Sequence, residues 1–432
     1  MDIRKKNKVS VVTLGCAKNT VDSERLMNQL KVNDFFLTNE TTDIDTVIIN
    51  TCGFIESAKQ ESIDTIFEAV GMKKEGRIKK IIVAGCLSER YKEDLIKEIP
   101  EVDAFFGTEK YEGILKELGG ELKYELLGER VITTPSHTAY LKISEGCDNP
   151  CSFCAIPLMR GKHKSKSIED LVRETEFLAK NNTKELILIA QDLSDYGKDI
   201  YGKRVLAELL NRLSEVSGIE WIRLMYVYPS HFPDDVYDVI AKNEKICKYI
   251  DIPLQHISDD VLKSMRRGIT KKRTIEVLNK LREKIPGVSI RTTFIVGYPA
   301  EKKEDFNELI DFIEEFKFDR VGVFHYSVEE NTPSFILGDP VNEEEKEFRR
   351  EHLMETQKEI SLHLNQSFVG KKLKVLIESE EGNYFIGRSY RDAPEIDGEI
   401  LILNEGQNLI LGNFYSTEIV DFNEYDLFGK II

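Results

Sequence analysis

Three cysteine thiols stand close together in the middle of the chain, at Cys147, Cys151 and Cys154. Pro150 lies in the first gap of this C-x-x-x-C-x-x-C spacing and Phe153 in the second, which suits a loop wrapped round a metal cluster. Thiolates are the usual ligands of iron–sulfur clusters. Three thiolates on a cluster of four irons leave one iron without a protein ligand. The spacing therefore predicts a 4Fe-4S cluster whose open iron can hold a substrate or cofactor.

A structural zinc site and a set of unrelated buried cysteines are the alternative interpretations of this stretch. Zinc sites usually have four ligands, often as two C-x-x-C pairs. His163 is the nearby candidate for a fourth ligand.

A second set of three cysteines follows three apolar runs in the first part of the chain. Cys16, Cys52 and Cys86 each come directly after a predicted buried strand. The carboxyl ends of parallel strands line one edge of a sheet, where ligand sites form, so the three thiols can converge there. Small cysteines also pack at strand ends without any ligand, which is the alternative. Three in the same position favour a second cluster with an open iron.

The segment that must position these thiols, residues 7–130, alternates strand and helix patterns. This alternation predicts a parallel α/β domain. The predicted strands are 9–14, 45–50, 80–84 and 102–106, and the predicted helices are 22–30, 56–70, 91–98 and 109–118.

Residues 131–366 contain six further strand–helix units, which predict a partial (β/α)6 barrel of the TIM type. The predicted strands are 139–143, 185–190, 221–226, 249–253, 289–296 and 320–326. Active-site groups of such barrels lie at the carboxyl ends of the strands, and the Cys147 loop follows the first strand as this rule requires. A long charged helix over 342–365 closes the domain.

Residues 367–432 show strand patterns separated by turn residues, which predict a small antiparallel barrel of the OB type. The predicted strands are 373–378, 384–389, 399–403, 408–411 and 416–420.

The composition of the 432 residues limits where and on what the protein acts. The charged N-terminal residues 1–6 are not followed by the apolar segment of a signal peptide. No apolar run in the chain is long enough to cross a bilayer. We therefore expect a cytoplasmic protein without membrane contact. In a cytoplasmic protein, seven cysteines indicate metal ligands or catalytic thiols rather than disulfides. We expect Cys247 to be a core residue. The net charge of −16 argues against stable binding of nucleic acid.

The cysteine pattern resembles that of a known family. The Cys147 stretch, with Phe153 just before the third cysteine, resembles the signature of radical S-adenosylmethionine (SAM) enzymes. With the second set of cysteines, the chain resembles the methylthiotransferases, which have an auxiliary cluster in an N-terminal domain and end in a TRAM domain.

Two stretches resemble the branch of this family that modifies a ribosomal protein. One is Leu-Gly-Cys-Ala-Lys-Asn over residues 14–19, where the tRNA-modifying branch usually has Gln-Met-Asn after the cysteine. The other is Gln255-His256, where the tRNA branch tends to have Gln-Ser-Gly. Ala17 and Thr20 depart mildly from the ribosomal branch and do not affect the ligands.

The resemblance implies a reaction in which a methylthio group is added to the β-carbon of an aspartate in the S-twelve protein of the small ribosomal subunit. One electron from one cluster would cleave SAM to methionine and a 5′-deoxyadenosyl radical, which removes a hydrogen atom. The other cluster would present sulfur, and a second SAM would supply the methyl group and leave as S-adenosylhomocysteine. Two 4Fe-4S clusters, SAM and a reductant of the flavodoxin or ferredoxin type are implied.

The resemblance also implies that strand-end residues bind SAM or substrate. These residues are Phe153, Gln191, Asp192, Gln255 and Thr293. Gln191 and Asp192 alternatively cap a helix. His256 is a candidate substrate contact, although a lone histidine is more often structural.

Two other functions stay open from the sequence. A tRNA adenosine methylthiotransferase would have a basic terminal barrel, whereas residues 367–432 contain six Lys or Arg against twelve Asp or Glu. That acidic barrel suits a basic ribosomal protein, or is simply a solvated surface. A non-catalytic iron–sulfur carrier would not need SAM-type strand ends.

Overall fold

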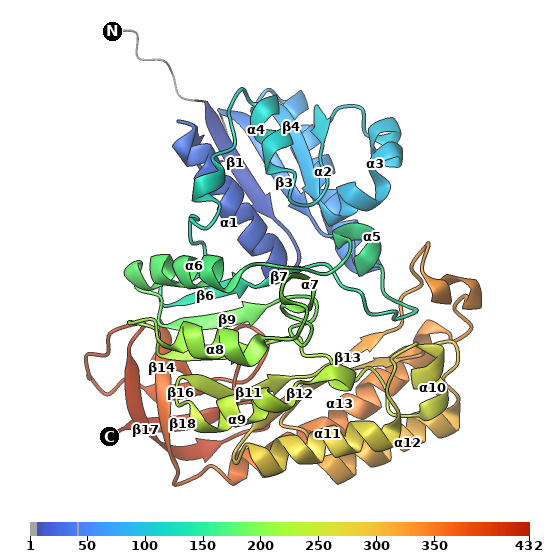
Figure 1. Ribbon diagram of the computed structural model, residues 1–432, viewed down its shortest axis with the longest axis vertical. Coiled ribbons are helices and arrows are strands. Elements are labelled where there is room, and N and C mark those ends of the chain that lie inside the picture. Colours follow the sequence, from blue (N-terminus) through green and yellow to red (C-terminus); the bar gives the residue numbers. More distant parts are fainter. Residues whose placement is uncertain (1–6, 41–42) are drawn as a thin grey trace.

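Two parallel sheets and one closed barrel follow one another along the chain (Figure 1). The computed structural model describes residues 7–40 and 43–432; residues 1–6, on which the expected absence of a signal peptide rests, lie outside this part. In the described part, no helix combines the length and the hydrophobicity that crossing a membrane requires. The predicted α/β fold class, with its partial central barrel and small terminal barrel, is confirmed.

The N-terminal unit is a five-stranded parallel sheet in the order β2-β1-β3-β4-β5. Its elements are β1 (Lys8–Thr13), α1 (Ala17–Val32), β2 (Phe36–Leu37), β3 (Ile44–Thr51), α2 (Glu56–Lys74), β4 (Ile78–Gly85), α3 (Cys86–Glu98), β5 (Ala104–Phe105), α4 (Tyr111–Glu117) and the 3-10 turn η1 (Tyr124–Leu126). Apolar side chains of α2 and α3 cover one face of the sheet, and those of α1 and α4 cover the other. The two-residue strand β2 was not predicted, because it is too short to show a periodicity.

The central unit has the six parallel strands that were predicted, and their order in the sheet is β13-β12-β11-β10-β9-β6. Its strands are β6 (Thr138–Lys142), β9 (Glu185–Ile189), β10 (Trp221–Leu224), β11 (Ile246–Asp251), β12 (Ser289–Val296) and β13 (Arg320–His325). A small ribbon of β7 (Ser144–Glu145) and β8 (Lys164–Ser165) lies beside the cysteine loop.

Helices cover the outer face of this curved sheet and form the largest apolar core with it. They are α6 (Ile168–Lys180), α8 (Leu206–Ser214), α9 (Asp234–Lys242), α11 (Lys271–Lys284), α12 (Lys303–Phe316) and α13 (Glu343–Gln366). The short helices α5 (Ile156–Arg160), α7 (Lys198–Tyr201) and α10 (Asp259–Ser264) and the 3-10 turns η2 (Pro229–His231) and η3 (Pro333–Leu337) lie in the connections between these elements. The long helix predicted over 342–365 is α13.

The C-terminal unit is a closed barrel in the order β14-β15-β16-β18-β17. Its strands are β14 (Lys372–Glu381), β15 (Tyr384–Arg388), β16 (Ile400–Leu403), β17 (Phe414–Phe422) and β18 (Leu427–Ile431). One pair, β16 with β18, is parallel rather than antiparallel. The predicted strand 408–411 is wrong, because those residues lie in the irregular segment between β16 and β17, and β18 was not predicted.

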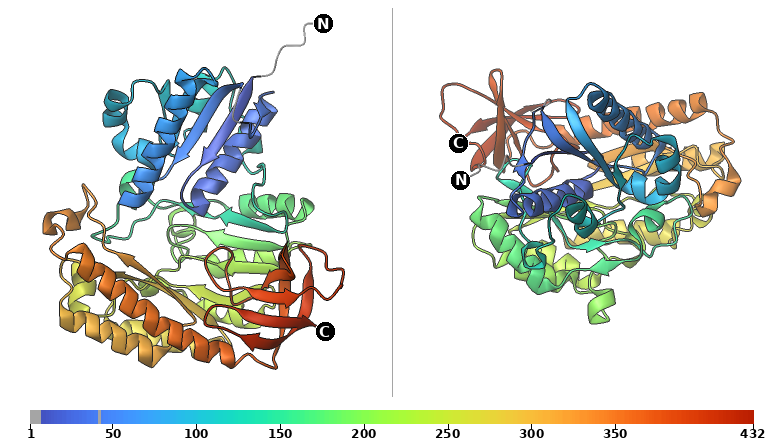
Figure 2. Two further views of the ribbon diagram at one scale, coloured as in Figure 1. Left: turned by 180° about the vertical axis from the view of Figure 1, so that it is seen from behind. Right: turned by 90° about the horizontal axis from the view of Figure 1, so that it is seen from above.

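A segment of the C-terminal unit closes the amino-terminal end of the central sheet, on the side away from the cysteine loops (Figure 2). The Glu185 carboxylate, on β9, accepts hydrogen bonds from two arginines there. Arg223 of β10 donates at 2.9 Å and Arg388 of β15 donates at 2.6 Å. All three side chains are at most 2% exposed. Burial alone would raise the pKa of the Glu185 carboxyl, but Arg388 and Arg223 lower it to about 2.

We expect Glu185→Gln to destabilise this junction strongly. The substitution leaves the buried Arg223 guanidinium without its anion and leaves Arg388 with Glu378 as its one remaining carboxylate partner. Breaking a buried pair in this way costs about 3–5 kcal/mol. Thermal unfolding should show a lower midpoint, with early proteolytic release of the C-terminal unit.

Glu220→Gln is the matched control, because Glu220 forms an exposed ion pair with Lys374 across the same junction. Exposed pairs contribute about 0–1 kcal/mol, so its midpoint should stay near that of the unmodified protein. Equal effects of the two substitutions would contradict the role given to Glu185.

Candidate functional site

The loop that carries Cys147, Cys151 and Cys154 is fastened to the rim of the central sheet through its own backbone. The Ser152 amide donates to the Met265 carbonyl at 2.9 Å, and the Ser152 hydroxyl donates to the Ser264 carbonyl at 2.8 Å. The loop therefore has a fixed conformation at the carboxyl ends of the strands, where barrel enzymes have their active sites.

Nitrogen donors face the sulfur atoms of this loop. The Asn149 amide donates to Cys147 Sγ at 3.4 Å, and the Arg267 guanidinium donates to Cys151 Sγ at 3.3 Å. Burial raises the pKa of the Cys147 thiol to about 11 and that of the Cys154 thiol to about 12. Sulfur ligands with N–H donors are the environment of protein-bound iron–sulfur clusters, and this set fits one.

His163, the alternative fourth ligand of a zinc site, has other partners. Its Nε2 atom lies 3.1 Å from the Ser165 hydroxyl and 3.9 Å from an Asp199 carboxylate oxygen. These contacts hold β8 to α7 and give the zinc interpretation no support.

The other three cysteines converge at the carboxyl edge of the N-terminal sheet, as their positions after β1, β3 and β4 predict. Cys86 Sγ lies 3.9 Å from the side-chain oxygen of Asn19, whose amide bonds the loops of the other two cysteines. Burial raises the pKa of the Cys86 thiol to about 12, although Arg160 opposes this shift. Gly15 has a φ of +86°, and a Cβ atom there would lie 2.6 Å from the Cβ of Cys52. Glycine is therefore required where these two loops meet.

Two of these thiols stand at the amino ends of helices. Cys16 is the residue that precedes α1, and Cys86 is the first residue of α3. Unpaired backbone N–H groups and the helix dipole favour negative charge at this end. The arrangement suits thiolates that carry an anionic cluster.

Asn19 connects the loops of the N-terminal unit to one another, and the sequence did not single it out. Its amide donates to the carbonyls of Leu14 at 2.7 Å and Thr51 at 3.1 Å, one from each of two cysteine loops. Its carbonyl accepts from Arg160 at 2.5 Å, which comes from the central unit. The signal was present, since Asn19 belongs to the Leu-Gly-Cys-Ala-Lys-Asn stretch already quoted.

The two cysteine sites face each other across the junction between the N-terminal and central units. Cys86 packs against Ala155 and Met159, and Ala155 directly follows Cys154. The Lys18 ammonium, two residues after Cys16, lies 3.4 Å from the centroid of the Tyr226 ring, just past the end of β10. The edges of both parallel sheets therefore open on the same space.

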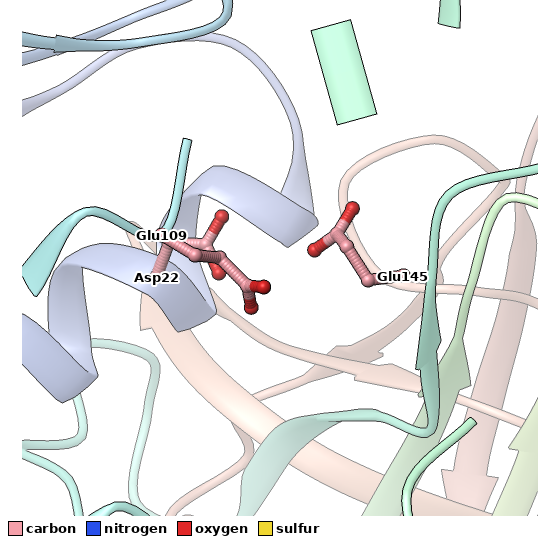
Figure 3. Close-up of side chains that lie close together, drawn as sticks. All are labelled: Asp22, Glu109 and Glu145. Carbon is pink, nitrogen blue, oxygen red and sulfur yellow. The ribbon is translucent and has the colours of Figure 1, made fainter. Parts of the chain in front are cut away.

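A network of buried charges fixes this junction. One carboxylate oxygen from each of the buried Asp22, the half-buried Glu145 and the exposed Glu109 lies within 4.8 Å of the other two. Figure 3 shows the three side chains close together. Lys142 contacts all three, and Arg160 donates to Asp22 at 2.9 Å and to Glu145 at 3.0 Å. Burial alone would raise the pKa of Asp22, but Lys142 and Arg160 lower it to about 2. These carboxylates are therefore occupied by cations in an ion-pair network.

Two of the predicted strand-end residues have unsatisfied polar atoms. Gln191 donates to Glu145 at 2.8 Å, but its Oε1 atom is buried without a partner in the described part of the chain. Gln255, whose φ is +74°, likewise has a buried Oε1 atom without a partner there. Buried polar atoms of this kind usually find a ligand or water, so both residues fit the binding of a polar cofactor.

The other three predicted residues already have protein contacts. Asp192 accepts from Asn149 at 2.7 Å and from the Ser194 amide at 2.7 Å, and burial raises the pKa of its carboxyl. The second bond closes a local turn; the alternative interpretation, that Gln191 and Asp192 cap a helix, is wrong, because the next helix, α7, begins at Lys198. Thr293 Oγ1 lies 3.5 Å from Arg291. Phe153 packs on the apolar cluster of Met265 and its neighbours behind the cysteine loop.

His256 is fully buried, and its described contacts are structural. Its Nδ1 atom accepts from the Ser258 amide at 3.0 Å, and its Nε2 atom lies 3.6 Å from Glu301. Glu301 in turn pairs with Arg349 on α13 at 3.2 Å. The substrate contact expected of His256 stays a prediction.

Three family models match the chain along its length. The model described as "Uncharacterized protein family UPF0004" matches residues 8–107, that of the radical SAM superfamily matches residues 141–313, and that of the TRAM domain matches residues 369–432. Membership of the radical SAM superfamily implies SAM and a 4Fe-4S cluster.

Solved structures share the fold at low sequence identity. The radical S-adenosylmethionine methyltransferase TsrM from Kitasatospora setae, with its tryptophan substrate and a SAM analogue bound, superposes with a TM-score of 0.55 at 13% identity, over 87% of this chain and 79% of that one. The cobalamin-dependent S-adenosylmethionine radical enzyme OxsB reaches 0.52 at 15% identity, over 80% of this chain and 56% of that one. These likenesses concern the fold alone.

Curated relatives match at much higher identity and over nearly the whole chain. The ribosomal protein uS12 methylthiotransferase RimO of Cytophaga hutchinsonii is 53% identical over 99% of this chain and 98% of its own. The RimO proteins of Flavobacterium johnsoniae and Bacteroides fragilis are 54% and 48% identical, again over 99% of this chain, and over 98% and 100% of their own. The resemblance to methylthiotransferases of the ribosomal branch is confirmed, and the chain belongs to the family of ribosomal protein uS12 methylthiotransferases, RimO.

Proposed function

We propose that this protein adds a methylthio group to the β-carbon of an aspartate in ribosomal protein uS12. The observation that supports this most directly is the meeting of two sets of three cysteines at one junction, in a chain whose relatives are named uS12 methylthiotransferases. A tRNA substrate, the alternative from the sequence, has no such support, because the relatives are named for uS12.

The proposed metal ligands are the two sets of three cysteines. Cys147, Cys151 and Cys154 would hold the 4Fe-4S cluster that the superfamily implies, and Cys16, Cys52 and Cys86 would hold a second, auxiliary 4Fe-4S cluster. When bound, the first cluster supplies the electron that cleaves SAM and the second supplies the site for sulfur.

Side chains round these loops would bind and orient the reactants. Gln191 and Gln255 offer their unpartnered carbonyl oxygens to SAM or substrate. Asp192, Thr293 and Phe153 lie beside the same strand ends and stay in the proposed SAM site, while His256 stays a proposed substrate contact. The N-terminal unit covers the strand ends and so limits the access of water.

The remaining expectations belong to this proposal as well. We propose domains at 7–130, 131–366 and 367–432, because each sheet lies within one of these ranges. A flavodoxin or ferredoxin would supply electrons, and the acidic terminal barrel would face a basic protein rather than nucleic acid. A cytoplasmic location, where ribosomal proteins are found, stays a prediction.

Alanine substitutions in the two sets of cysteines should each remove the iron of one cluster and leave the iron of the other. Cys52→Ala and Cys151→Ala each remove one ligand of a different cluster, so each protein, reconstituted without oxygen, should retain about half of the iron that two clusters hold. Cys247→Ala should retain all of it, because that thiol is a buried core residue. Iron loss in Cys247→Ala, or full iron in Cys52→Ala, would refute the assignment.

Activity on uS12 is the direct test of the function. Reconstituted protein with SAM and dithionite should produce a methylthio mass gain on an aspartate of uS12, and none on unmodified tRNA, when both are read by mass spectrometry. Cys52→Ala should still form 5′-deoxyadenosine but give no methylthio product, because its first cluster is intact. A product on tRNA alone would overturn the proposed substrate.

A further inference from the structure

Lys18 is a buried cation at the junction of the two cysteine sites that has no acidic partner. It lies in the first turn of α1, is 9% exposed, and rests over the face of Tyr226. Among the residues that the structure describes, no carboxylate lies within ion-pair distance of its ammonium group, and no group accepts a hydrogen bond from it. An aromatic face attracts a cation but cannot replace the hydrogen bonds that an ammonium makes in water.

The other cations round this space are all occupied. Arg160 pairs with Asp22 and Glu145, and Lys142 pairs with the same two acids and with Glu109. Arg291 pairs with Asp251 at 3.0 Å and Asp397 at 3.4 Å. Arg267 donates to Cys151 and to the Pro253 carbonyl. Lys18 alone, in the described part of the junction, could accept an anion without breaking an existing pair.

Its position also matches where an anion of the substrate must lie. Lys18 follows Cys16 by two residues, and Tyr226 follows a strand of the central sheet, so the ammonium stands between the thiols of one unit and the strand ends of the other. A carbon that meets both cysteine sites must occupy this space. In an aspartate the β-carbon is bonded directly to the carboxylate carbon, so that carboxylate lies within one bond of the reacting atom.

We propose that Lys18 binds the side-chain carboxylate of the aspartate that is modified, and so selects an acidic side chain as substrate. This inference rests on the proposed function and assigns a residue to its specificity. Charge-assisted hydrogen bonds are short and strong, so they orient a flexible side chain well.

The test compares two enzymes with two substrates. Lys18→Met removes the charge and keeps the length of the side chain, and an Asp→Asn variant of uS12 at the modified position removes the carboxylate. The dissociation constant of each pair is measured with cluster-loaded protein and SAM but without reductant, so that no turnover occurs. A hydrogen bond between charged groups implies that Lys18→Met weakens binding of unmodified uS12 by about 10- to 100-fold.

The asparagine variant of uS12 should bind the two enzymes within about twofold of each other, because the charged interaction is absent in both cases. Lys18→Arg should keep the preference for aspartate over asparagine. Lys31→Met is the matched control, since Lys31 lies exposed at the end of the same helix and should change no constant.

Two results would overturn the assignment. If Lys18→Met weakens the binding of both uS12 forms equally, or of neither form, then Lys18 supports the fold through Tyr226 and does not bind the substrate carboxylate. If it lowers 5′-deoxyadenosine formation in the absence of uS12, Lys18 binds SAM instead. Failure of the unsubstituted enzyme to modify uS12 would refute the proposed function. This outcome is distinguishable from the two results above, because it concerns the enzyme with Lys18 in place.

Discussion

The reactive edges of two parallel sheets are held face to face by buried charges. Asp22 of the N-terminal unit lies between Lys142 and Arg160 of the central unit, and Arg25 pairs with Glu174 at 3.0 Å across the same junction. Burying such pairs gains little free energy compared with apolar packing, because desolvation offsets the attraction. What they provide is a single relative position of the two units. A sheet edge that slid by one strand would bring the wrong loops together and leave charges unpaired.

This constraint explains why so many polar residues of α1 are buried. Asn19, Asp22, Glu24 and Arg25 lie on a helix that would present a polar face to water in an isolated domain. Here that face meets the central unit, and its side chains bind loops and cations there. The same helix brings Cys16 and Lys18 to the junction, so the stability of the interface and the geometry of the proposed site depend on one element.

The parallel sheets and the convergence of the thiols were predictable, because both follow from local patterns. Apolar runs followed by Cys16, Cys52 and Cys86 show a strand, its end and a ligand within a few residues. The start of α1 at Ala17, five residues before the predicted helix, was missed because its buried residues are polar and show no apolar periodicity. The last barrel strand was missed because Gly429 interrupts its apolar pattern; a Cβ atom there would lie 2.4 Å from the Thr417 side chain of β17. The contact between Arg25 and Glu174 joins residues 149 positions apart. Contacts of this kind cannot be predicted from the pattern of residues within one segment.

The closure of the central sheet by Arg388 has a consequence for biosynthesis. Arg388 reaches Glu185 across 203 positions of sequence. While the chain is being made, β9 and β10 can pair long before this arginine exists, and during that interval Glu185 has Arg223 as its only partner in the triad. The nascent central sheet therefore has an open, hydrated end until the terminal barrel folds. Ribosome-bound chains halted before residue 388 should accordingly depend on chaperones more than the finished protein does.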